Sequence, residues 1–299
     1  EMTSSLVGSE MCIRDSHMIA FKYKQLYNVD DTGIAIKYYT ERGYYTPPHW
    51  HSPLELIFVL NGSAEMSING HRHLVVPGDF VLIDSNQIHE SKCATMTMGL
   101  CIHYSRQHLQ KYIPDLDHLN LQFSRDILVK EKLDIYLQIC ELLKKLPPLH
   151  VQQPLGYRLE CESIAMEVLY LILTHFARPA EESLIPENIG SLDRLSAITS
   201  YVDDHYSKPI SLEEAAQKLG LSREYFCRFF KQSLGVTFTR YVNQIRLIHI
   251  YHDICNTEDG IMEIVERHGF TNYKLFNKMF KEIYGCTPRE IRHKLAIDK

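Results

Sequence analysis

The chain lacks several features that define whole classes of protein. Its 299 residues include eight cysteines, but no two form a C-x-x-C pair and their spacing shows no regular framework. Such dispersed thiols argue against a disulfide-stapled secreted domain and are typical of small core residues in a reducing cytosol. No apolar run approaches the length that a membrane-spanning helix needs. We therefore expect a cytoplasmic protein without a membrane segment.

The N-terminus also lacks the apolar stretch of a secretory signal peptide. The residues that end at Ser16-His17-Met18 look instead like translated vector or adapter sequence, with native translation starting at Met18. Residues 1–17 are therefore expected to be a non-native leader that is not part of the fold. Catalytic Ser/His/Asp motifs and phosphate-binding loops are absent as well, which argues weakly against several classes of enzyme.

A strongly basic composition is missing too. The formal net charge is −5, which is unexpected for a protein that binds nucleic acid. Residues 1–190 carry 16 Lys+Arg against 23 Asp+Glu, whereas residues 191–299 carry 16 against 14. The acidic excess therefore lies in the N-terminal part. The length predicts two domains, each large enough to bury its own core.

What the sequence does contain is a repeat near its C-terminus. Segments 221–231 and 271–281 carry the same pattern, followed in both by a glycine and a threonine. Five pairs of residues fall at one offset: Phe226 and Phe276, Phe230 and Phe280, Lys231 and Lys281, Gly235 and Gly285, Thr237 and Thr287. A solenoid needs three or more copies. Two copies, each with its own turn, therefore favour a paired module.

The first copy predicts two helices joined by a tight turn. Ser211 and Glu214 form a capping box at the start of a helix over Leu212–Leu219. Gly220 can adopt the positive φ that ends such a helix. Ser222 then caps a second helix, and its apolar face predicts burial of Phe226, Phe229 and Phe230.

The second copy repeats this layout, with Gly269 in the turn and a helix near Asn272–Ile283. A long helix through Tyr241–Tyr251 connects the two copies. Helix, short glycine-containing turn, helix is the helix-turn-helix motif. A charged face on such a helix is often only solvated. Here the turn and a basic second helix recur together, which favours a binding role for the faces opposite the core.

Residues 193–293 resemble the paired helix-turn-helix domain of AraC-type transcription regulators. Three departures from the family pattern are Ile250, Val265 and His268, where small or aliphatic residues are usual. The resemblance rests on Ile210-Ser-Leu, Ala216, Leu221-Ser222, Tyr225-Phe226, Phe230-Lys231, Gly235, Tyr241, Arg246-Leu247, Gly269-Phe270, Phe276, Phe280-Lys281, Gly285, Thr287-Pro288 and Arg292.

The resemblance implies that one recognition helix of each unit enters the major groove of double-stranded DNA. Arg228 suits a guanine edge and Asn277 an adenine edge. Lys231 and Lys281 are expected on phosphate or at their own helix ends. The implied DNA-facing residues are Arg223, Glu224, Cys227, Arg228 and Lys231 in the first unit, and Tyr273, Lys274, Asn277, Lys278 and Lys281 in the second.

The N-terminal half predicts short strands separated by Gly, Pro, Asn and Ser. Asn69-Gly70 between two alternating runs is a strong signal for a two-residue hairpin. Strands at this spacing indicate a barrel or jelly roll. The expected strands are Gly33–Tyr39, Leu54–Leu60, Ala64–Ile68, Arg72–Val76, Phe80–Ile83 and Met96–Tyr104.

A motif inside these strands resembles the first motif of cupin domains. It consists of Gly43, His49, His51, Glu55 and Gly62 in the pattern G-x5-H-x-H-x3-E-x6-G. Gly78-Asp79 followed by His89 resembles the second cupin motif, although Asp84, Asn86 and Cys93 depart from it. The fold class expected overall is α+β: a cupin-like β-barrel with flanking helices, followed by an all-α paired helix-turn-helix domain.

The chemistry of His49, His51, Glu55 and His89 leaves two readings open. Alternate residues of a strand share a face, so three imidazoles and one carboxylate could bind a divalent transition metal. Alternatively, the same groups form a hydrogen-bonding pocket for a small-molecule effector such as a sugar, with Tyr38, Tyr45 or Trp50 stacking on it. No cofactor follows with certainty from the sequence.

Two amphipathic stretches lie between the barrel and the DNA-binding module. Asp126–Leu146 places Leu133, Tyr136, Leu137, Cys140 and Leu143 on one stripe, and Tyr157–Phe176 does so with Ile164, Ala165, Val168, Leu169 and Ile172. Pro147-Pro148 is expected to separate them. The resemblance implies a homodimer formed through one of them. The predicted domains are 18–178 for sensing and dimerisation, a linker at 179–192, and 193–299 for DNA binding.

The sequence thus predicts a DNA-binding transcription activator, not an enzyme, that responds to a small molecule in the barrel. RNA polymerase is an implied partner. The alternative is a metal-dependent cupin enzyme fused to a DNA-binding module. Bound metal and turnover at His49, His51, Glu55 and His89 would distinguish that alternative.

Overall fold

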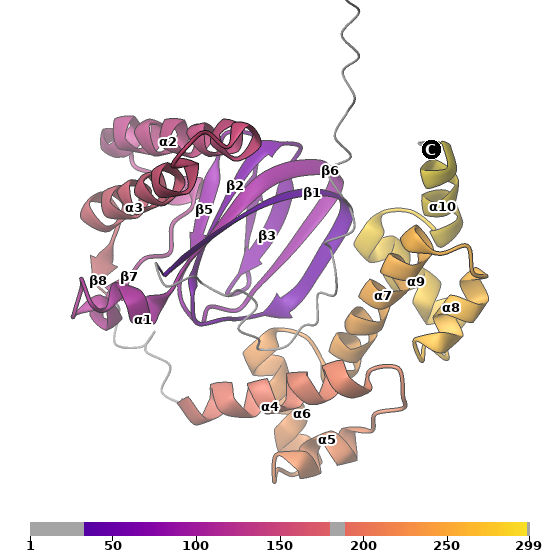
Figure 1. The fold of residues 1–299 in the computed structure, drawn as a ribbon. Coiled ribbons are helices and arrows are strands. Elements are labelled where there is room, and N and C mark those ends of the chain that lie inside the picture. The colour runs from indigo at the N-terminus through magenta and orange to yellow at the C-terminus, as the bar shows by residue number, and fades with distance from the viewer. Residues whose placement is uncertain (1–32, 180–188, 298–299) are drawn as a thin grey trace, which may run out of the picture.

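The computed structural model describes residues 33–179 and 189–297. A strand-rich region and a helical region follow one another along the chain, which confirms the expected α+β fold (Figure 1). The predicted leader at residues 1–17 and most of the predicted linker at 179–192 lie outside the described residues.

The strand-rich region is a curved antiparallel sheet with the strand order β4-β3-β6-β2-β5, in which β1 also pairs with β6. Asn69 and Gly70 both have positive φ and connect β3 to β4, so the predicted hairpin is confirmed. The strands are β1 (Ile34–His49), β2 (Leu54–Asn61), β3 (Ala64–Ile68), β4 (His71–Val75), β5 (Phe80–Ile83) and β6 (His89–Tyr104).

Strands β1 and β6 are much longer than the expected segments 33–39 and 96–104. They pair along nearly their whole length, with shifts of register between Arg42 and Tyr44 and between Thr46 and His49. Irregularities of this kind bend a strand without ending it. Alternation in the sequence is broken at Gly43 and at Pro47-Pro48, which explains why a search for regular alternation stops early.

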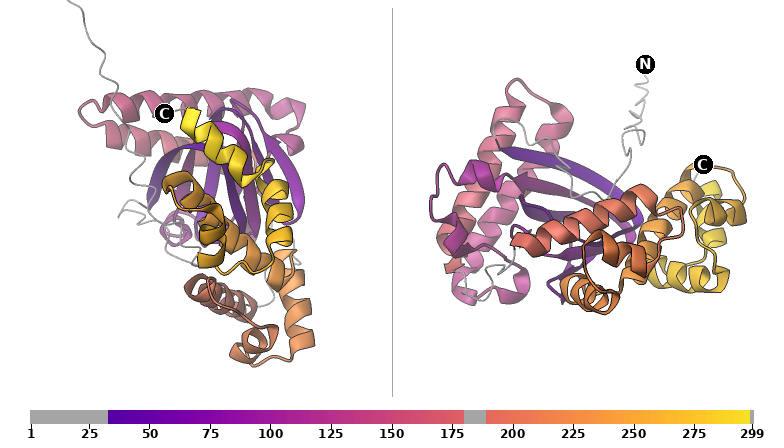
Figure 2. Two further views of the ribbon diagram at one scale, coloured as in Figure 1. Left: turned by 90° about the vertical axis from the view of Figure 1, so that its right-hand side faces the viewer. Right: turned by 90° about the horizontal axis from the view of Figure 1, so that it is seen from below.

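Each face of the sheet has its own partners. Leu54, Leu56 and Phe58 of β2 join the large core that also contains side chains of α2 (Leu133–Gln152) and α3 (Tyr157–His175). These two helices cover one side of the barrel, and the C-terminal helices lie on the other (Figure 1, Figure 2). The intervening residues of β2, among them Glu55, point to the opposite face of the sheet. Short elements complete the region: α1 (Arg106–Leu109), β7 (Leu119–Asn120) and β8 (Arg178–Pro179).

The prediction for the first of these helices is wrong in two respects. Pro147 and Pro148 lie inside α2 rather than after it, and the helix ends only before Gln153, which has a φ of 45°. Burial of Leu146 and a hydrogen bond from Tyr38 Oη to Leu146 O anchor this part of the helix to the barrel. Leu133 and Leu137, expected on the buried stripe, are 40% and 50% exposed. The predicted stripe of α3 is buried.

The C-terminal region contains the two predicted helix-turn-helix units. Ser211 and Glu214 form the expected capping box, and Ser222 and Asn272 cap the second helix of each unit. The helices are α4 (Ile189–His205), α5 (Leu212–Lys218), α6 (Arg223–Leu234), α7 (Phe238–Asn256), α8 (Ile261–Arg267), α9 (Tyr273–Tyr284) and α10 (Pro288–Ile297). Helix α7 is the predicted connection between the units.

The cores of the two units are built alike. Phe226 and Phe230 in the first and Phe276 and Phe280 in the second are fully buried, as expected. Phe229 was expected to be buried but is only partly so, because it packs at the margin of the first core.

The two regions touch through the end of β1. Trp50 is part of the core of the first unit, and Tyr45 is part of the core of the second. Tyr45 Oη accepts a hydrogen bond of 2.6 Å from Gln244 Nε2 of α7 and donates one of 3.0 Å to Glu90 Oε2 of β6. Nearby, Lys92 Nζ donates to the backbone oxygen of Glu282 in α9 at 3.1 Å. The barrel is therefore in direct contact with both units.

The equivalent glycines of the two turns allow a matched test. Gly220 and Gly269 both have positive φ, 65° and 74°. A Cβ on Gly220 would meet nothing within 4 Å, whereas one on Gly269 would collide with the backbone carbonyl of Ser207. We expect Gly220→Ala to lower the free energy of unfolding by about 1–2 kcal/mol, the strain of left-handed backbone. Gly269→Ala should lower the free energy of unfolding by clearly more than this. Denaturant titration of both variants checks this, and equal losses would contradict it.

Candidate DNA-binding surface and buried histidine cluster

The residues expected to face DNA lie on α6 and α9, the second helix of each unit. Most of their side chains are exposed, opposite the phenylalanine cores. These exposed residues are Arg223, Glu224, Arg228 and Lys231 on α6, and Tyr273, Lys274, Lys278 and Lys281 on α9. Both helices thus present basic, accessible faces.

Three of the expected contact residues have partners within the protein. Arg223 Nη1 lies 2.9 Å from Glu213 Oε1 of α5, and both side chains are more than half exposed. Asn277 is partly buried and donates from Nδ2 to the backbone oxygen of Tyr273 at 3.0 Å. Cys227 is partly buried against the core of the first unit. Asn277 would have to exchange its internal hydrogen bond for one to a base, whereas Arg228 is exposed.

The predicted quartet in the barrel comes together. His49 lies at the end of β1, His51 two residues later, Glu55 on β2 and His89 at the start of β6. One ligand atom of each side chain lies within 4.8 Å of those of the others. His51 and His89 are 6% and 2% exposed, and Glu55 is 9% exposed. The sequence motif therefore brings three imidazoles and one carboxylate to a single buried point.

The outer nitrogens of the three imidazoles are each held by a backbone carbonyl. The Nδ1 atoms of His49, His51 and His89 lie 3.0, 2.9 and 2.8 Å from the oxygens of Pro47, Pro53 and Gln87. A carbonyl oxygen only accepts, so each Nδ1 carries the proton. In a neutral ring the Nε2 atom is then an unprotonated electron-pair donor.

Two of these Nε2 atoms, those of His51 and His89, face the carboxylate. Glu55 Oε2 lies 3.0 Å from Nε2 of both His51 and His89. A lone pair this close to a carboxylate oxygen is repulsive unless the imidazole is protonated or a cation lies between them. His89 Nε2 does not meet hydrogen-bond geometry with any partner, although it is buried. The arrangement thus calls for positive charge at the centre of the cluster.

The pKa shifts follow from burial and from these contacts. Burial by itself would raise the pKa of Glu55, but contacts from His103, His51 and His89 outweigh it and hold the pKa well below its usual range. Burial lowers the pKa of His49 well below its usual value, helped by repulsion from His89 and His51. Burial opposes protonation of His51 too, but hydrogen bonding and attraction to Glu55 raise its pKa. The contacts therefore favour an ionised Glu55 and a neutral His49, and they shift His51 toward its protonated form.

Two residues of this cluster were missed by the sequence analysis. Glu55 Oε1 lies 3.0 Å from Cys101 Sγ and 3.4 Å from His103 Nε2, and both residues are buried on β6. Glu55 pairs with His103 in the antiparallel register of β2 and β6. The signal was the C-x-H spacing inside the predicted strand 96–104, which puts both side chains on one face. Only the strand pairing shows that this face is the one that carries Glu55.

The aromatic residues expected beside the quartet lie elsewhere. Tyr38 stacks on His150 of α2 at 4.1 Å and bonds to the Leu146 carbonyl. Trp50 and Tyr45 pack into the helix-turn-helix cores instead of the barrel. The structure therefore brings together the charged members of the predicted ligand site and not its aromatic members.

Comparison with known proteins agrees with both halves of this picture. A helix-turn-helix domain model matches residues 215–294, and a cupin domain model matches residues 39–103. The HTH-type transcriptional activator RhaS of Mannheimia succiniciproducens is 26% identical over 250 residues, which cover 82% of this chain and 89% of that protein. The uncharacterized HTH-type transcriptional regulator YdeC of Bacillus subtilis is 25% identical over 255 residues, or 82% and 85% of the two chains.

Similar solved structures include an AraC-type DNA-binding domain protein from Chromobacterium violaceum and ToxT from Vibrio cholerae. The first is 29% identical, covers 36% of this chain and 97% of its own, and has a TM-score of 0.33. The second is 12% identical, covers 88% and 98%, and has a TM-score of 0.43.

The domain matches and the observed fold define a protein that joins a cupin domain to a helix-turn-helix DNA-binding domain. The chain is a DNA-binding transcription regulator of the AraC type, and the relatives named above are transcription regulators as well. Within the described residues, no helix combines the length and the apolarity needed to cross a membrane.

Arg228 provides a test of the DNA-facing surface. Its exposed guanidinium should read one base, so Arg228→Ala should weaken binding to the preferred DNA by about 1–3 kcal/mol. The preferred DNA can be obtained by selection from a random duplex pool, and fluorescence anisotropy gives both affinities. Binding to random DNA should change much less. Equal weakening on both would assign Arg228 to phosphate instead of a base.

Proposed function

We propose that this chain activates transcription in response to a divalent transition metal held in the barrel. The observation that carries the proposal is the cluster of His49, His51, Glu55 and His89, in which carbonyl-held Nδ1 atoms direct the Nε2 atoms toward an ionised, buried carboxylate. Backbone acceptors on the outer nitrogen are what orient metal-binding histidines.

The space at the cluster fits an ion better than a sugar. The rings of His49 and His89 are 4.1 Å apart and those of His51 and His89 are 4.9 Å apart. The possible ligand atoms themselves lie within 4.8 Å of one another, a separation that suits metal–nitrogen bonds of about 2.0–2.1 Å after small side-chain adjustments, whereas a bound organic molecule needs a cavity of about 300–1,000 Å³. A bound cation would also balance Glu55 and replace the proton on His51.

A sugar or small acid has another place open to it. A pocket of about 370 Å³ lies between the start of β1, α1 and α3. Its walls include both apolar and titratable side chains, namely Ile34, His108, Tyr112, Leu159, Glu162 and Met166. An organic effector is therefore the alternative ligand, and it would bind in this pocket and not at the predicted quartet.

The donor set also bears on the competing enzyme hypothesis. Catalytic metal sites keep an open position for substrate, whereas closed sites are structural or regulatory. Here Cys101 and His103 approach the same carboxylate from the far side, and His103 is fully buried. Protein side chains therefore surround the carboxylate and leave little room for a substrate beside it. This arrangement favours sensing over catalytic turnover.

Metal binding is the first prediction of this proposal. The purified chain should bind roughly one equivalent of Zn²⁺, Ni²⁺ or a similar ion, because the donors are those such ions prefer. His51→Ala should weaken binding by more than the roughly 10- to 100-fold that loss of an outer partner costs. Exposed His71 serves as the matched control, so His71→Ala should bind normally. Elemental analysis and competition with a chelator measure both.

The pH dependence of this binding has a definite sign. Glu55 raises the pKa of His51, so the proton on His51 competes with the metal as pH falls through that pKa. Apparent metal affinity should therefore decrease toward acid pH, and the release should approach one proton per metal bound at pH values below that pKa. Normal metal binding by His51→Ala would overturn the site. In that case, a sugar or acid that raises the melting temperature would point to the pocket beside α3.

Residues 49–51 offer a route from the barrel to the DNA-binding domain. His49 and His51 belong to the metal cluster, while Trp50 between them is 5% exposed and lies in the core of the first unit. Any movement of the two histidines therefore acts on Trp50. Tyr45 extends the contact to Gln244 of α7. A ligand can shift DNA affinity only through such a difference between states.

Removal of the Tyr45 hydroxyl allows a test of this coupling. Metal should change the affinity for selected DNA, by roughly 5- to 150-fold if coupling is typical. Tyr45→Phe removes the bonds to Gln244 and Glu90 but no ring, and should reduce that response while leaving metal stoichiometry intact. Tyr170→Phe, at an exposed tyrosine of α3, is the control. An undiminished response in Tyr45→Phe and Trp50→Ala would refute the route.

Activation and dimerisation complete the proposal. Exposed Leu133 and Leu137 stand one turn apart on α2, which supports a homodimer through that helix. RNA polymerase is the expected partner at the promoter. Sedimentation measurements check the dimer, and in vitro transcription with and without metal checks activation.

A further inference from the structure

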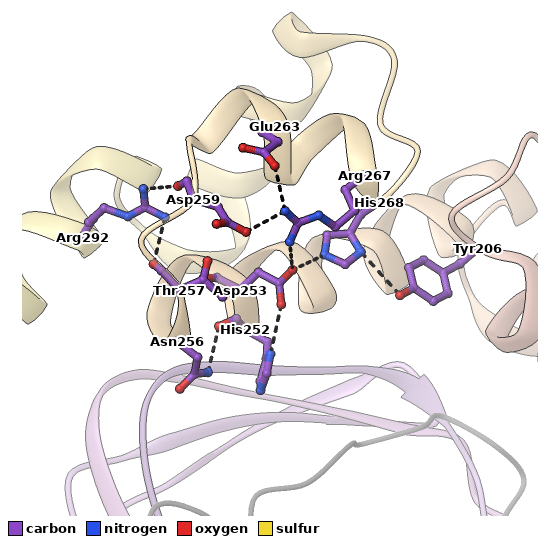
Figure 3. Close-up of polar contacts among 10 residues, drawn as sticks. All are labelled: Tyr206, His252, Asp253, Asn256, Thr257, Asp259, Glu263, Arg267, His268 and Arg292. Carbon is purple, nitrogen blue, oxygen red and sulfur yellow. Dashed lines mark hydrogen bonds and ion pairs between the residues drawn. The ribbon is translucent and has the colours of Figure 1, made fainter.

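The junction between the two helix-turn-helix units is a polar network drawn in Figure 3. On one side is Tyr206, in the segment between α4 and α5 that leads into the first unit. On the other is His268, in the turn between α8 and α9 of the second unit. His268 Nδ1 lies 3.4 Å from Tyr206 Oη, and His268 Nε2 lies 2.8 Å from Asp253 Oδ2 of α7. One imidazole thus joins three elements.

The bridge is buried and reinforced. His268 is 8% exposed. Tyr206 also stacks on His249 of α7, with ring centres 4.0 Å apart and planes 3° from parallel. Burial and the neighbouring His268 lower the pKa of His249 to about 4, so this ring is neutral at physiological pH. Arg267 Nη1 adds a contact of 3.3 Å to Asp253 Oδ2.

The backbones of the two units are also in contact at this point. Arg246 of α7 donates to the backbone oxygens of Tyr206 and Lys208 at 2.7 and 2.9 Å. Gly269, next to His268, approaches the Ser207 carbonyl so closely that any side chain would collide with it. The units are therefore attached to each other directly as well as through α7.

We propose that His268 is a positioning residue, whose bridge between Tyr206 and Asp253 sets the orientation of α9 relative to α6 and so the spacing of the two DNA segments that the chain reads. The proposal rests on both helices contacting DNA. It is independent of the metal site. Helix α9 begins at Tyr273, five residues after His268, so the turn that His268 anchors also aims this helix.

The physical advantage is preorganisation. Two recognition helices joined by one connecting helix could bend about it, and each binding event would then restrict that motion at a cost in free energy. A second attachment through His268 removes the freedom beforehand. The second DNA contact then follows the first at a high effective concentration, provided that the spacing between the two DNA segments matches the fixed geometry.

The experiment is a comparison of DNA selections. Random duplex pools are selected with the full chain and with His268→Leu, which keeps an apolar side chain of similar size but removes both hydrogen bonds. The wild type should enrich two short motifs at one fixed spacing. The variant should enrich the same two motifs at several spacings. Its affinity for the wild-type site should fall roughly tenfold, which corresponds to 1.4 kcal/mol, with no change on a probe that carries only the first motif.

His252 provides the matched control. It contacts the same Asp253 at 3.3 Å but is exposed and sits beside it on α7, so it joins no second element. His252→Leu should keep the single spacing. Tyr206→Phe removes one hydroxyl and should relax the spacing in the same way as His268→Leu. Combined with His268→Leu, it should add nothing further, because His268→Leu already removes the bond that the Tyr206 hydroxyl makes.

Three outcomes would overturn the proposal. His268→Leu could keep the single spacing, or it could weaken binding to the one-motif probe equally, which would make His268 important only for folding of the second unit. The wild type could also select just one motif. None of these results bears on metal binding or on its effect on DNA affinity, so the proposed function stands or falls separately.

Discussion

Consecutive side chains at the end of β1 face opposite environments, and the link between the barrel and the DNA-binding domain depends on this alternation. His49 and His51 meet Glu55 inside the barrel, while Trp50 packs in the core of the first helix-turn-helix unit. A buried carboxylate surrounded by imidazoles is tolerated only with compensating charge. The proposed metal-binding cluster therefore lies within one residue of the core that contains side chains of α5 and α6.

The parts of the site that depend on residues close together in the sequence could be predicted, and the parts that depend on strand pairing could not. The H-x-H-x3-E spacing alone brings His49, His51 and Glu55 together, because strand geometry has a fixed period. His103 needed the pairing of β2 with β6, which no local pattern specifies. Trp50 lies opposite the quartet because it alternates with His49 and His51, whereas Tyr45 was misplaced because β1 shifts register between Thr46 and His49. Each such shift alters which face a side chain occupies.

The helical region was predicted more fully because its signals are local. Caps at Ser211, Ser222 and Asn272 and glycines in the turns act within one helical turn of their own positions. The barrel helices are different. Pro147 and Pro148 would end an isolated helix, yet α2 continues through them because Leu146 is buried against the barrel. Tertiary packing determines where this helix ends, and the local sequence pattern carries no information about that packing.

Helix α7 carries both the contact to the barrel and the contact to the turn before α9. Gln244 in its first half bonds to Tyr45 of the barrel, and Asp253 in its second half bonds to His268 in the turn before α9. These residues are separated by about 13 Å along the helix axis. Because a helix buried on several sides moves as a rigid body, a displacement imposed by the barrel at Gln244 also reaches Asp253. Because His268 ties the turn before α9 to the same helix, both recognition helices would follow such a displacement of α7 together, at the spacing that His268 sets. His268, one of three residues that depart from the family pattern, is the point at which the turn before α9 is held to α7.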